Sequence, residues 1–420
     1  MEKDIVNNFN TFIMPFQLGI YLAINAIQDA VLIVDGPNCL LPKAEFIYGN
    51  HDLNSTLLCP DGLNRIYYTM SNPHYQKGNP EIKLQALISV LANADKYGAV
   101  AITGQAYHSL SGIDYDGISS SVKGKIPVVS IPPKSIEYDW LEGYALTLKS
   151  IANALPADNV KKRKNTVVLA GCLFDRNEGD CNGNISEMKR LLKICGLDVI
   201  CNFPGGSSFQ ELKSALDAEY VISMPYAREA SEIIAKKGGS KLIEIGLPIG
   251  FSGTAEWVKQ ICHASGREMP DEIIKEKERY FRQYLKIGSI LHHKSVIFAG
   301  DPYLFEAIAS LCKEILMRPD TAVLDCLPRK MKFYSKNILF QPTTSEVREL
   351  VSKLTNFEKP SVIIGNSFAL TEKFAKGIPF IELGFPSFSS HFLNETPFFG
   401  YAGVMNIISR LLNSQMSIVE

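Results

Sequence analysis

The stretch AVLIVDGPNC, residues 30–39, decides the fold of this chain. It begins with five apolar residues, most of them branched at Cβ, which predicts a strand at Ala30–Asp35. An unbroken apolar run is typical of a strand that is covered on both faces, as the strands of parallel sheets are. Gly36 and Pro37 then predict a turn at the carboxyl end of this strand, and Cys39 follows the turn.

The same order of apolar run, loop and amphipathic segment recurs along the chain. This alternation predicts βαβ units and parallel sheets. The pattern restarts after the basic segment Lys161–Lys164 and again at Lys294–Gly300. We therefore predict an α/β fold of three doubly wound Rossmann-like domains with mostly parallel sheets, at residues 1–160, 161–290 and 291–420.

Individual elements follow from the same pattern. The predicted strands are Ala30–Asp35, Gly98–Thr103, Ile126–Ile131, Thr166–Ala170, Leu197–Asn202, Tyr220–Met224, Lys241–Ile245, Lys294–Gly300, Ala322–Asp325, Ile338–Phe340, Ser361–Ile364 and Phe380–Glu382. The predicted helices are Pro15–Ala26, Glu81–Ala94, Leu141–Leu155, Ile185–Cys195, Ser208–Asp217, Arg228–Lys237, Thr254–Ser265, Asp271–Leu285, Tyr303–Ile315, Ser345–Leu354, Leu370–Lys376 and Val404–Leu412.

The composition is that of an ordinary globular protein. The 420 residues suggest about three domains. Lys and Arg number 43 against 44 Asp and Glu, so no charge excess favours nucleic acid or an anionic membrane. The N-terminus lacks the pattern of a signal peptide, and Leu18–Gly36 carries polar residues, so we expect a cytoplasmic protein with no membrane span. Nine cysteines argue against a complete disulfide framework.

Several motifs with known chemistry are absent from the sequence. No G-x-G-x-x-G follows a predicted strand, and no G-x-x-x-x-G-K-[ST] occurs, so we expect neither a bound dinucleotide nor ATP hydrolysis in this chain. The sequence also lacks C-x-x-C, H-E-x-x-H and G-x-S-x-G. Zinc sites, thioredoxin-like redox chemistry and serine hydrolysis therefore have no support.

Short segments spread from about residue 14 to residue 412 carry a resemblance to a known family. Their order is more specific than any one of them. They include Asp35-Gly36-Pro37-Asn38-Cys39, Ile126-Pro127-Val128-Val129, Gly143-Tyr144, Leu247-Pro248-Ile249-Gly250 with Thr254, Gly377-Ile378-Pro379, Gly384-Phe385-Pro386 and Gly400-Tyr401-Ala402-Gly403. In this order they resemble the nitrogenase component 1 family, which includes nitrogenase subunits, cofactor-assembly scaffolds and tetrapyrrole reductases.

The resemblance implies a fold, partners and a cofactor. Members of the family are oligomers of three-domain α/β subunits, so we expect a homodimer or a heterodimer with a related subunit. In members of the family, an iron–sulfur cluster lies at the subunit interface, where cysteines of the first domains hold it. In these relatives a separate ATP-dependent iron–sulfur reductase supplies electrons, and a small-molecule substrate or cofactor lies between the domains. We expect the same partners here.

The sequence departs from the family at the cluster cysteines. Of the three typical positions only Cys39 is kept, because the others fall at about Met14 and at Ala106. Two subunits that each offer Cys39 and Cys59 would supply four thiolates, the number that a [4Fe–4S] cluster takes. We prefer this arrangement. A ligand other than cysteine (Asp35, Asp61 or His108), cysteines from a partner subunit, and loss of the cluster stay open.

The resemblance also suggests residues that would face a cofactor or substrate. Ligands of parallel sheets bind beyond the carboxyl ends of the strands. Gly36, Pro37, Gln105 and Asp114 are candidates for cofactor binding there. His108 is the preferred proton donor, because it follows the strand end nearest Cys39 and an imidazole titrates near neutral pH.

A second candidate catalytic histidine lies near the C-terminus. His391 follows the turn Gly384-Phe385-Pro386, where a residue facing the cofactor could sit. No cysteine matches the family's cofactor ligand, so we expect neither an iron–molybdenum cofactor nor nitrogen fixation.

These residues favour an electron-transfer enzyme subunit that reduces an organic substrate, with a tetrapyrrole among the candidates. Two alternatives remain open. One is a non-catalytic scaffold for metallocofactor assembly. The other is a redox-inactive protein that binds a small molecule on the same fold.

Overall fold

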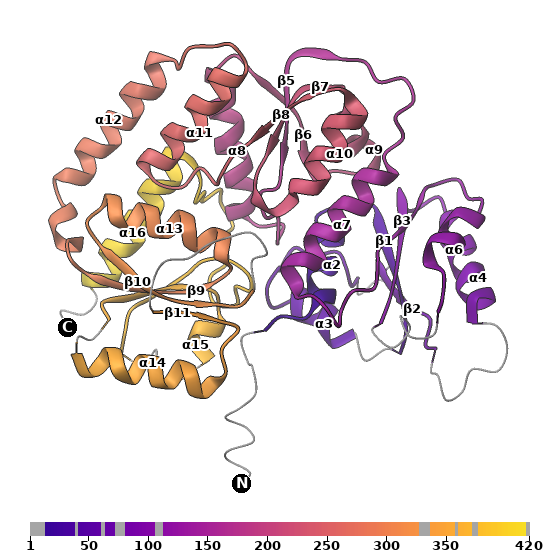
Figure 1. Cartoon of the computed structure of the whole chain (residues 1–420), viewed down its shortest axis with the longest axis horizontal. Helices are drawn as coiled ribbons and strands as arrows, with labels where there is room; N and C mark the ends of the chain where they lie inside the picture. The colour runs from indigo at the N-terminus through magenta and orange to yellow at the C-terminus, as the bar shows by residue number, and fades with distance from the viewer. Residues whose placement is uncertain are drawn as a thin grey trace, which may run out of the picture. The chain divides into compact units, whose positions relative to one another are not determined.

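The computed structural model describes residues 13–37, 41–59, 64–71, 80–105, 112–326, 337–357, 360–371 and 377–416. These residues form two compact units (Figure 1). The first, which we call the two-sheet unit, comprises Pro15–Asn177 and Leu197–Glu244. The second, the one-sheet unit, comprises Glu178–Gly196, Ile245–Glu420 and the described residues of Met1–Met14.

The two-sheet unit alternates strands and helices along the chain. Its strands are β1 (Ala30–Asp35), β2 (Ile66–Tyr68), β3 (Ala99–Gly104), β4 (Val128–Ser130), β5 (Arg163–Ala170), β6 (Asp198–Phe203), β7 (Ala218–Ser223) and β8 (Lys241–Glu244). Its α-helices are α2 (Phe16–Asn25), α3 (Leu41–Ile47), α4 (Pro80–Ala92), α6 (Tyr115–Ser121), α7 (Trp140–Ala154), α9 (Phe209–Leu212) and α10 (Arg228–Gly238). Short 3-10 helices, η2 (Lys213–Asp217) and η3 (Pro225–Ala227), flank β7.

Both sheets of this unit are parallel. Their strand orders are β2-β1-β3-β4 and β6-β5-β7-β8. In the first sheet, Val31, Ile33 and Ile102 form a core with side chains of α4 and α6. Each order reverses direction next to its first strand, between β1 and β3 and between β5 and β7. In doubly wound sheets, ligands bind beyond the carboxyl ends of the strands at such a reversal.

Two glycines let helices α2 and α7 approach each other closely. All ten residues of α2 are buried. A Cβ at Gly19 of α2 would lie 1.8 Å from the backbone oxygen of Trp140, and one at Gly143 of α7 would lie 2.1 Å from that of Phe16. Because no other side chain fits at either position, the sequence specifies this helix pair through glycine.

The one-sheet unit contains one five-stranded parallel sheet. Its strands are β9 (Ser295–Gly300), β10 (Arg318–Leu324), β11 (Asn337–Phe340), β12 (Val362–Gly365) and β13 (Phe380–Glu382), in the order β11-β10-β9-β12-β13. Its helices are α8 (Gly179–Ile194), α11 (Phe251–Ala264), α12 (Asp271–Leu285), η4 (Gly288–Leu291), α13 (Pro302–Glu314), α14 (Thr344–Phe357), α15 (Phe368–Thr371) and α16 (Gly400–Met416).

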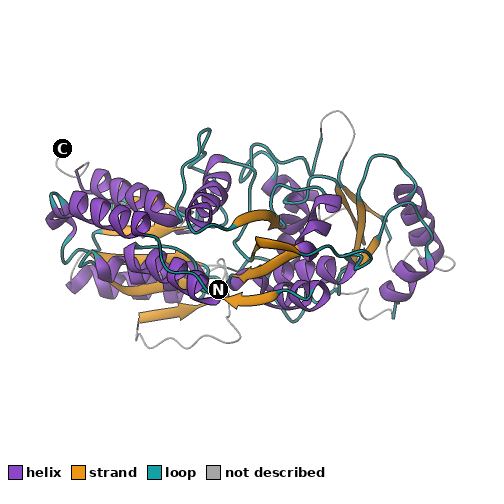
Figure 2. Ribbon diagram, turned by 90° about the horizontal axis from the view of Figure 1, so that it is seen from above, coloured by secondary structure: helices purple, strands orange, loops and turns teal. Residues whose placement is uncertain are grey.

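Helices cover both faces of this sheet (Figures 1 and 2). On one face, Ile297 and Ile363 pack against Val347 and Val351 of α14. On the other face, Phe298 of β9 contacts Phe305 of α13, with ring centroids 5.4 Å apart. The alternation of side chains along each strand therefore buries both faces, as the apolar runs in the sequence predicted.

The structure confirms the predicted class, α/β with parallel sheets. Two predicted strands, Ala30–Asp35 and Phe380–Glu382, match β1 and β13 residue for residue. The predicted domain boundaries near residues 160 and 290 stay predictions. Within the ranges described above, no helix combines the length and the apolar character needed to cross a bilayer.

Candidate functional site

The carboxyl edge of the first sheet brings together three of the predicted residues. β1 and β3 are neighbours in register, with Asp35 opposite Gly104, so the loops after both strands begin side by side. Gln105 Nε2 donates a hydrogen bond to the carbonyl of Pro37 at 3.3 Å, and its backbone amide donates to that of Asp35 at 3.1 Å. A Cβ at Gly36 would lie 2.7 Å from the Gln105 side chain. Gly36, Pro37 and Gln105 thus form one contact where the strand order reverses between β1 and β3.

A buried carboxylate lies directly behind this contact. Asp35 is 3% exposed. Its Oδ1 accepts hydrogen bonds from the hydroxyls of Thr69 at 2.5 Å and Ser71 at 2.9 Å, and its Oδ2 accepts one from the phenol of Tyr115 at 3.0 Å. The amide of Gly36 donates to Thr69 Oγ1 at 3.0 Å. Asp35 therefore ties the loops after β1 and β2 to the start of α6.

The three hydroxyl partners of Asp35 were missing from the sequence prediction. Thr69 and Ser71 follow β2, a strand of only three residues that the pattern of apolar residues did not reveal. Tyr115 opens α6 inside a segment rich in Ser, Gly and Asp. Side chains that meet through a neighbouring strand leave no local signal in the sequence.

Asp114 has a structural role in the described residues. It is exposed, and its Oδ1 accepts a hydrogen bond from the amide of Gly117 at 2.9 Å, which caps the N-terminus of α6. The assignment of Asp114 to cofactor binding stays a prediction.

Of the two candidate cluster cysteines, Cys59 is the one that the structure describes. Its side chain is half-buried, and its backbone amide donates to Asn64 Oδ1 at 3.0 Å. Cys39 lies outside the described residues, as do His108 and two other positions of the prediction, Asp61 and Ala106. Within the part of the chain that the structure covers, no three His, Cys, Asp or Glu side chains gather as a metal site would require.

Met14, which stands at one of the family's cysteine positions, is buried at 3% exposure. Its thioether is a neutral sulfur and supplies no thiolate.

The other described cysteines are buried. Burial raises the pKa of Cys172, which follows β5, to about 12, and its Sγ lies 3.5 Å from Asn202 Oδ1. Burial likewise raises the pKa of Cys312 on α13 to about 12. Neutral thiols of this kind are poor ligands and poor nucleophiles at neutral pH. These two side chains therefore pack in the protein interior as neutral core residues.

His391 lies in the one-sheet unit and pairs with a carboxylate. Its Nδ1 lies 2.9 Å from Oε1 of Glu178, which precedes helix α8. The side chain of Glu178 is 2% exposed and that of His391 is 25% exposed. The histidine was predicted from the sequence but its glutamate partner was not, since 213 positions separate the two residues.

The carboxyl edge of the third sheet also carries buried polar residues. Asp301, Asp325 and Asn366 follow β9, β10 and β12 and are each at most 2% exposed. Asp301 caps helix α13 through the amides of Tyr303 and Leu304, and Asn366 Nδ2 donates to Asp325 Oδ2 at 3.0 Å. These side chains hold the loops of the edge together.

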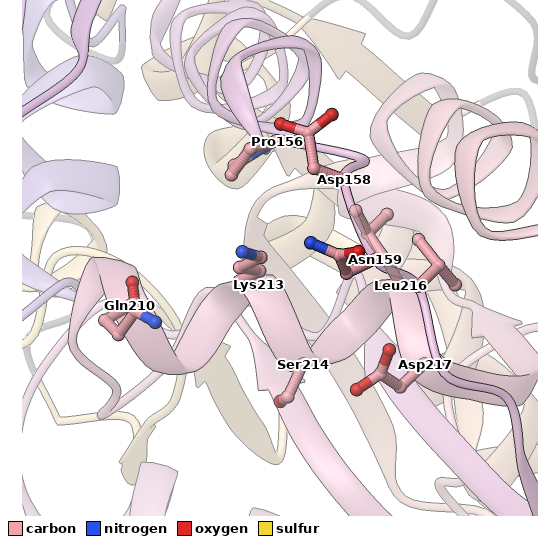
Figure 3. A pocket seen from close by; sticks show the side chains of 9 residues that line it. Pro156, Asp158, Asn159, Gln210, Lys213, Ser214, Leu216 and Asp217 are labelled. Carbon is pink, nitrogen blue, oxygen red and sulfur yellow. The ribbon is translucent and has the colours of Figure 1, made fainter.

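A surface hollow of about 230 Å³ lies in the two-sheet unit. Figure 3 shows the side chains that line it. Its walls come from the segments that precede β5 and β7, so it lies at the amino edge of the second sheet. Parallel sheets bind their ligands at the opposite, carboxyl edge, and we therefore do not assign the hollow to the site. The lining residues are Pro156, Asp158, Asn159, Val160, Gln210, Lys213, Ser214, Leu216 and Asp217.

The three parallel sheets and the polar loops at their carboxyl edges define a doubly wound α/β protein, in which the strand order of each sheet reverses once. Comparison with known families makes this class more specific. The family model "Nitrogenase component 1 type Oxidoreductase" matches residues 17–416. The chain therefore belongs to the nitrogenase component 1 family, and the resemblance found in the sequence is confirmed.

Two curated relatives show how distant the similarity is. The chain is 24% identical over 304 residues to the nitrogenase molybdenum-iron protein beta chain of Bradyrhizobium diazoefficiens, a match that covers 64% of this chain and 58% of that protein. It is 26% identical over 230 residues to the beta chain of Klebsiella pneumoniae, which covers 50% of this chain and 44% of that protein. The matches thus span less than two thirds of the length of these relatives.

The solved structure "Nitrogenase Cp1 at pH 6.5" shares the fold. It superposes with a TM-score of 0.82 and covers 98% of this chain and 94% of that chain, at 17% sequence identity. The predicted nitrogenase component 1-like architecture is thereby confirmed.

Proposed function

We propose that this chain is a subunit of a nitrogenase-like reductase that reduces an organic small molecule. A tetrapyrrole is one candidate substrate, and a separate ATP-dependent iron–sulfur reductase supplies the electrons. The observation that carries the proposal is the family match over residues 17–416. A second subunit, either another copy of this chain or a related chain, completes the oligomer. The name "beta chain" of the relatives, which implies a second type of chain, supports this last point.

The candidate metal ligands are thiols, which suit a [4Fe–4S] cluster shared between two subunits. Cys39 and Cys59 give two donors per chain, and two chains related by a two-fold axis give four. Cys59 is half-buried, unlike the other described cysteines, which are buried. Thiolate sulfur is the preferred ligand of iron–sulfur clusters, and a bound cluster would supply one-electron transfer.

The chain's own residues hold the turn that leads toward Cys39. Gln105 fixes the carbonyl of Pro37, while Asp35 and Thr69 fix the amide of Gly36 from behind. The loops after β2 and β3 therefore both support the end of β1 through hydrogen bonds. Such support preorganises the start of the turn, which lowers the entropy cost of ordering a ligand residue beyond it.

The cluster is tested by metal analysis of protein purified without oxygen. Iron and acid-labile sulfide are measured together with the paramagnetic resonance of the dithionite-reduced protein. We expect about two iron atoms per chain in a shared [4Fe–4S] cluster. Cys39→Ala and Cys59→Ala should each lose the iron, whereas Cys201→Ala, a buried thiol of β6, should keep it. Wild-type protein free of iron and sulfide would contradict the cluster.

Turnover is tested separately. The protein is mixed with an ATP-dependent iron–sulfur reductase, ATP, dithionite and candidate tetrapyrroles. Formation of the product is followed by absorbance. Product that depends on ATP and on Cys39 supports the reductase. Cluster binding without any turnover would favour the assembly scaffold instead. A third outcome is a metal-free protein whose affinity for a ligand is the same in the wild type and in Cys39→Ala. This outcome would favour the redox-inactive binding protein.

A further inference from the structure

Glu178 and His391 form a carboxylate–imidazole pair within the one-sheet unit. Oε1 of Glu178 lies 2.9 Å from His391 Nδ1, and Oε2 accepts a hydrogen bond from the backbone amide of Phe392 at 3.0 Å. The glutamate is nearly fully buried, whereas a quarter of the histidine side chain is exposed. A buried carboxylate therefore contacts one nitrogen of a ring that is partly exposed to solvent.

The backbone around the pair is fixed by further contacts. The amide of Gly179 donates to the carbonyl of Phe392 at 2.8 Å, and the carbonyl of Gly179 accepts from Thr396 at 2.9 Å. A Cβ at Gly179 would lie 2.0 Å from the backbone oxygen of Asn394, so this approach requires glycine. The segment that carries His391 is thus held against the start of helix α8 by main-chain hydrogen bonds as well as by Glu178.

The ionisation state of Glu178 determines which ring nitrogen carries the proton. An ionised carboxylate only accepts hydrogen bonds, so an ionised Glu178 makes Nδ1 of His391 the donor. In the neutral ring Nε2 then bears the lone pair, and in the charged ring Nε2–H is the proton that is free to leave. Glu178 also precedes the first turn of α8, where the helix dipole stabilises a negative charge.

We propose that Glu178 is a positioning residue that holds His391 as the Nδ1–H tautomer, so that Nε2 exchanges protons with the substrate. The proposal rests on the proposed reductase function. Reduction of one double bond of an organic substrate takes two electrons, which come from the iron–sulfur reductase, and two protons. One proton leaves Nε2 of the charged ring and forms a bond to the substrate, and water supplies the other. The ring, left neutral with its proton on Nδ1, takes up a new proton from water.

A substitution that preserves shape tests the tautomer directly. In Glu178→Gln the side-chain oxygen still accepts from Phe392, while the amide nitrogen donates to Nδ1 and moves the ring proton to Nε2. The full-length protein is labelled with ¹⁵N-histidine and recorded at pH 8.5, where an ordinary imidazole is neutral. The His391 resonances are assigned with His391→Gln. We expect a protonated Nδ1 in the wild type and a protonated Nε2 in Glu178→Gln.

A control on the same helix separates positioning from stability. Glu187 of α8 is also buried but pairs with Arg190. Glu187→Gln should change the thermal midpoint and leave the His391 spectrum as in the wild type. If Glu178→Gln leaves the His391 nitrogen shifts unchanged, the positioning proposal is wrong, whatever the turnover.

The turnover assay then tests the role in proton transfer. Loss of a positioned proton donor typically lowers the rate by about 10²–10⁴-fold. We therefore expect the turnover rates of Glu178→Gln and His391→Gln to fall by at least roughly 100-fold. Their thermal midpoints should stay near that of the wild type. Unchanged turnover in Glu178→Gln would overturn the proton-transfer role. A wild type that fails to turn over, with the tautomer reversed in Glu178→Gln, would instead reject the reductase function and keep the positioning relationship.

Discussion

Tyr115 donates its phenolic hydrogen to Asp35 across 80 positions of the chain, with 3.0 Å between Oη and Oδ2. This bond joins the first turn of α6 to the end of β1. It belongs to a buried network in which a carboxylate is held by hydroxyl groups from two other segments. The end of β1, from which the chain continues to the Gly36–Pro37 turn, therefore depends on side chains of distant loops.

The first prediction concerns this hydrogen bond and the glycine beside it. Tyr115→Phe should lower the free energy of unfolding by about 1.5–3 kcal/mol, because it removes a donor to a buried charged group. Gly104→Ala should also destabilise, by about 1–3 kcal/mol, since its Cβ would lie 2.2 Å from Tyr115 Oη. Removing that oxygen relieves part of the clash. The free energy of unfolding of the double variant should therefore fall by less than the sum of the two single losses. A urea double-mutant cycle measures the coupling, and strictly additive losses would contradict it.

The second prediction concerns the glycine contact between α2 and α7. Gly19→Ala should lower the free energy of unfolding by about 3 kcal/mol or more, because its Cβ would meet the Trp140 backbone oxygen, which cannot rotate away. Gly246→Ala is the matched control, since a Cβ there meets no atom within 4 Å. Chemical denaturation of both variants provides the comparison. Equal stability of the two would show that the helices can separate without cost.

The third prediction concerns the pH dependence of stability at Glu382. Burial alone would raise the pKa of this carboxyl group, but hydrogen bonds from the Ser367 hydroxyl and the amides of Phe388 and Ser389 outweigh burial and hold the pKa below its ordinary value of 4.5. A carboxyl group whose pKa is lower in the folded state stabilises the fold above its unfolded pKa. This contribution is lost as the pH falls from 4.5 through the folded value.

Stability curves between pH 3 and pH 7 measure this effect. Glu382→Gln should be less stable than the wild type at pH 7, and its acid limb should be flatter. Glu349→Gln, which removes an exposed carboxylate paired with Lys353, should leave the acid limb unchanged. An acid limb of Glu382→Gln as steep as that of the wild type would rule out the carboxylate as its source.

The sequence predicted much of the fold because apolar runs mark buried parallel strands. β1 and β13 were predicted residue for residue, and α7 was predicted to within one residue at each end. β2 and α6 were missed. β2 has only three residues, too few for a periodic pattern, and α6 depends on the cap at Asp114 and the burial of Tyr115 rather than on helix-forming residues.

The candidate site was predicted where topology alone brings residues together. Gly36 and Gln105 follow neighbouring parallel strands, so their contact follows from the strand order. The partner of His391 could not be found in this way. Glu178 approaches it through a loop after β5 and not through a strand end, and no local pattern in the sequence records such a pairing.

Helix α8 belongs to the one-sheet unit although the chain before and after it belongs to the two-sheet unit. This arrangement has a consequence for expressing parts of the protein. The chain leaves the two-sheet unit after Asn177, contributes Glu178–Gly196 to the other unit, and returns at Leu197. A fragment that ends before Glu178 lacks α10, on which α7 packs. A recombinant polypeptide meant to contain the whole two-sheet unit and nothing else must therefore replace residues 178–196 by a linker, because no single uninterrupted segment of the gene encodes that unit.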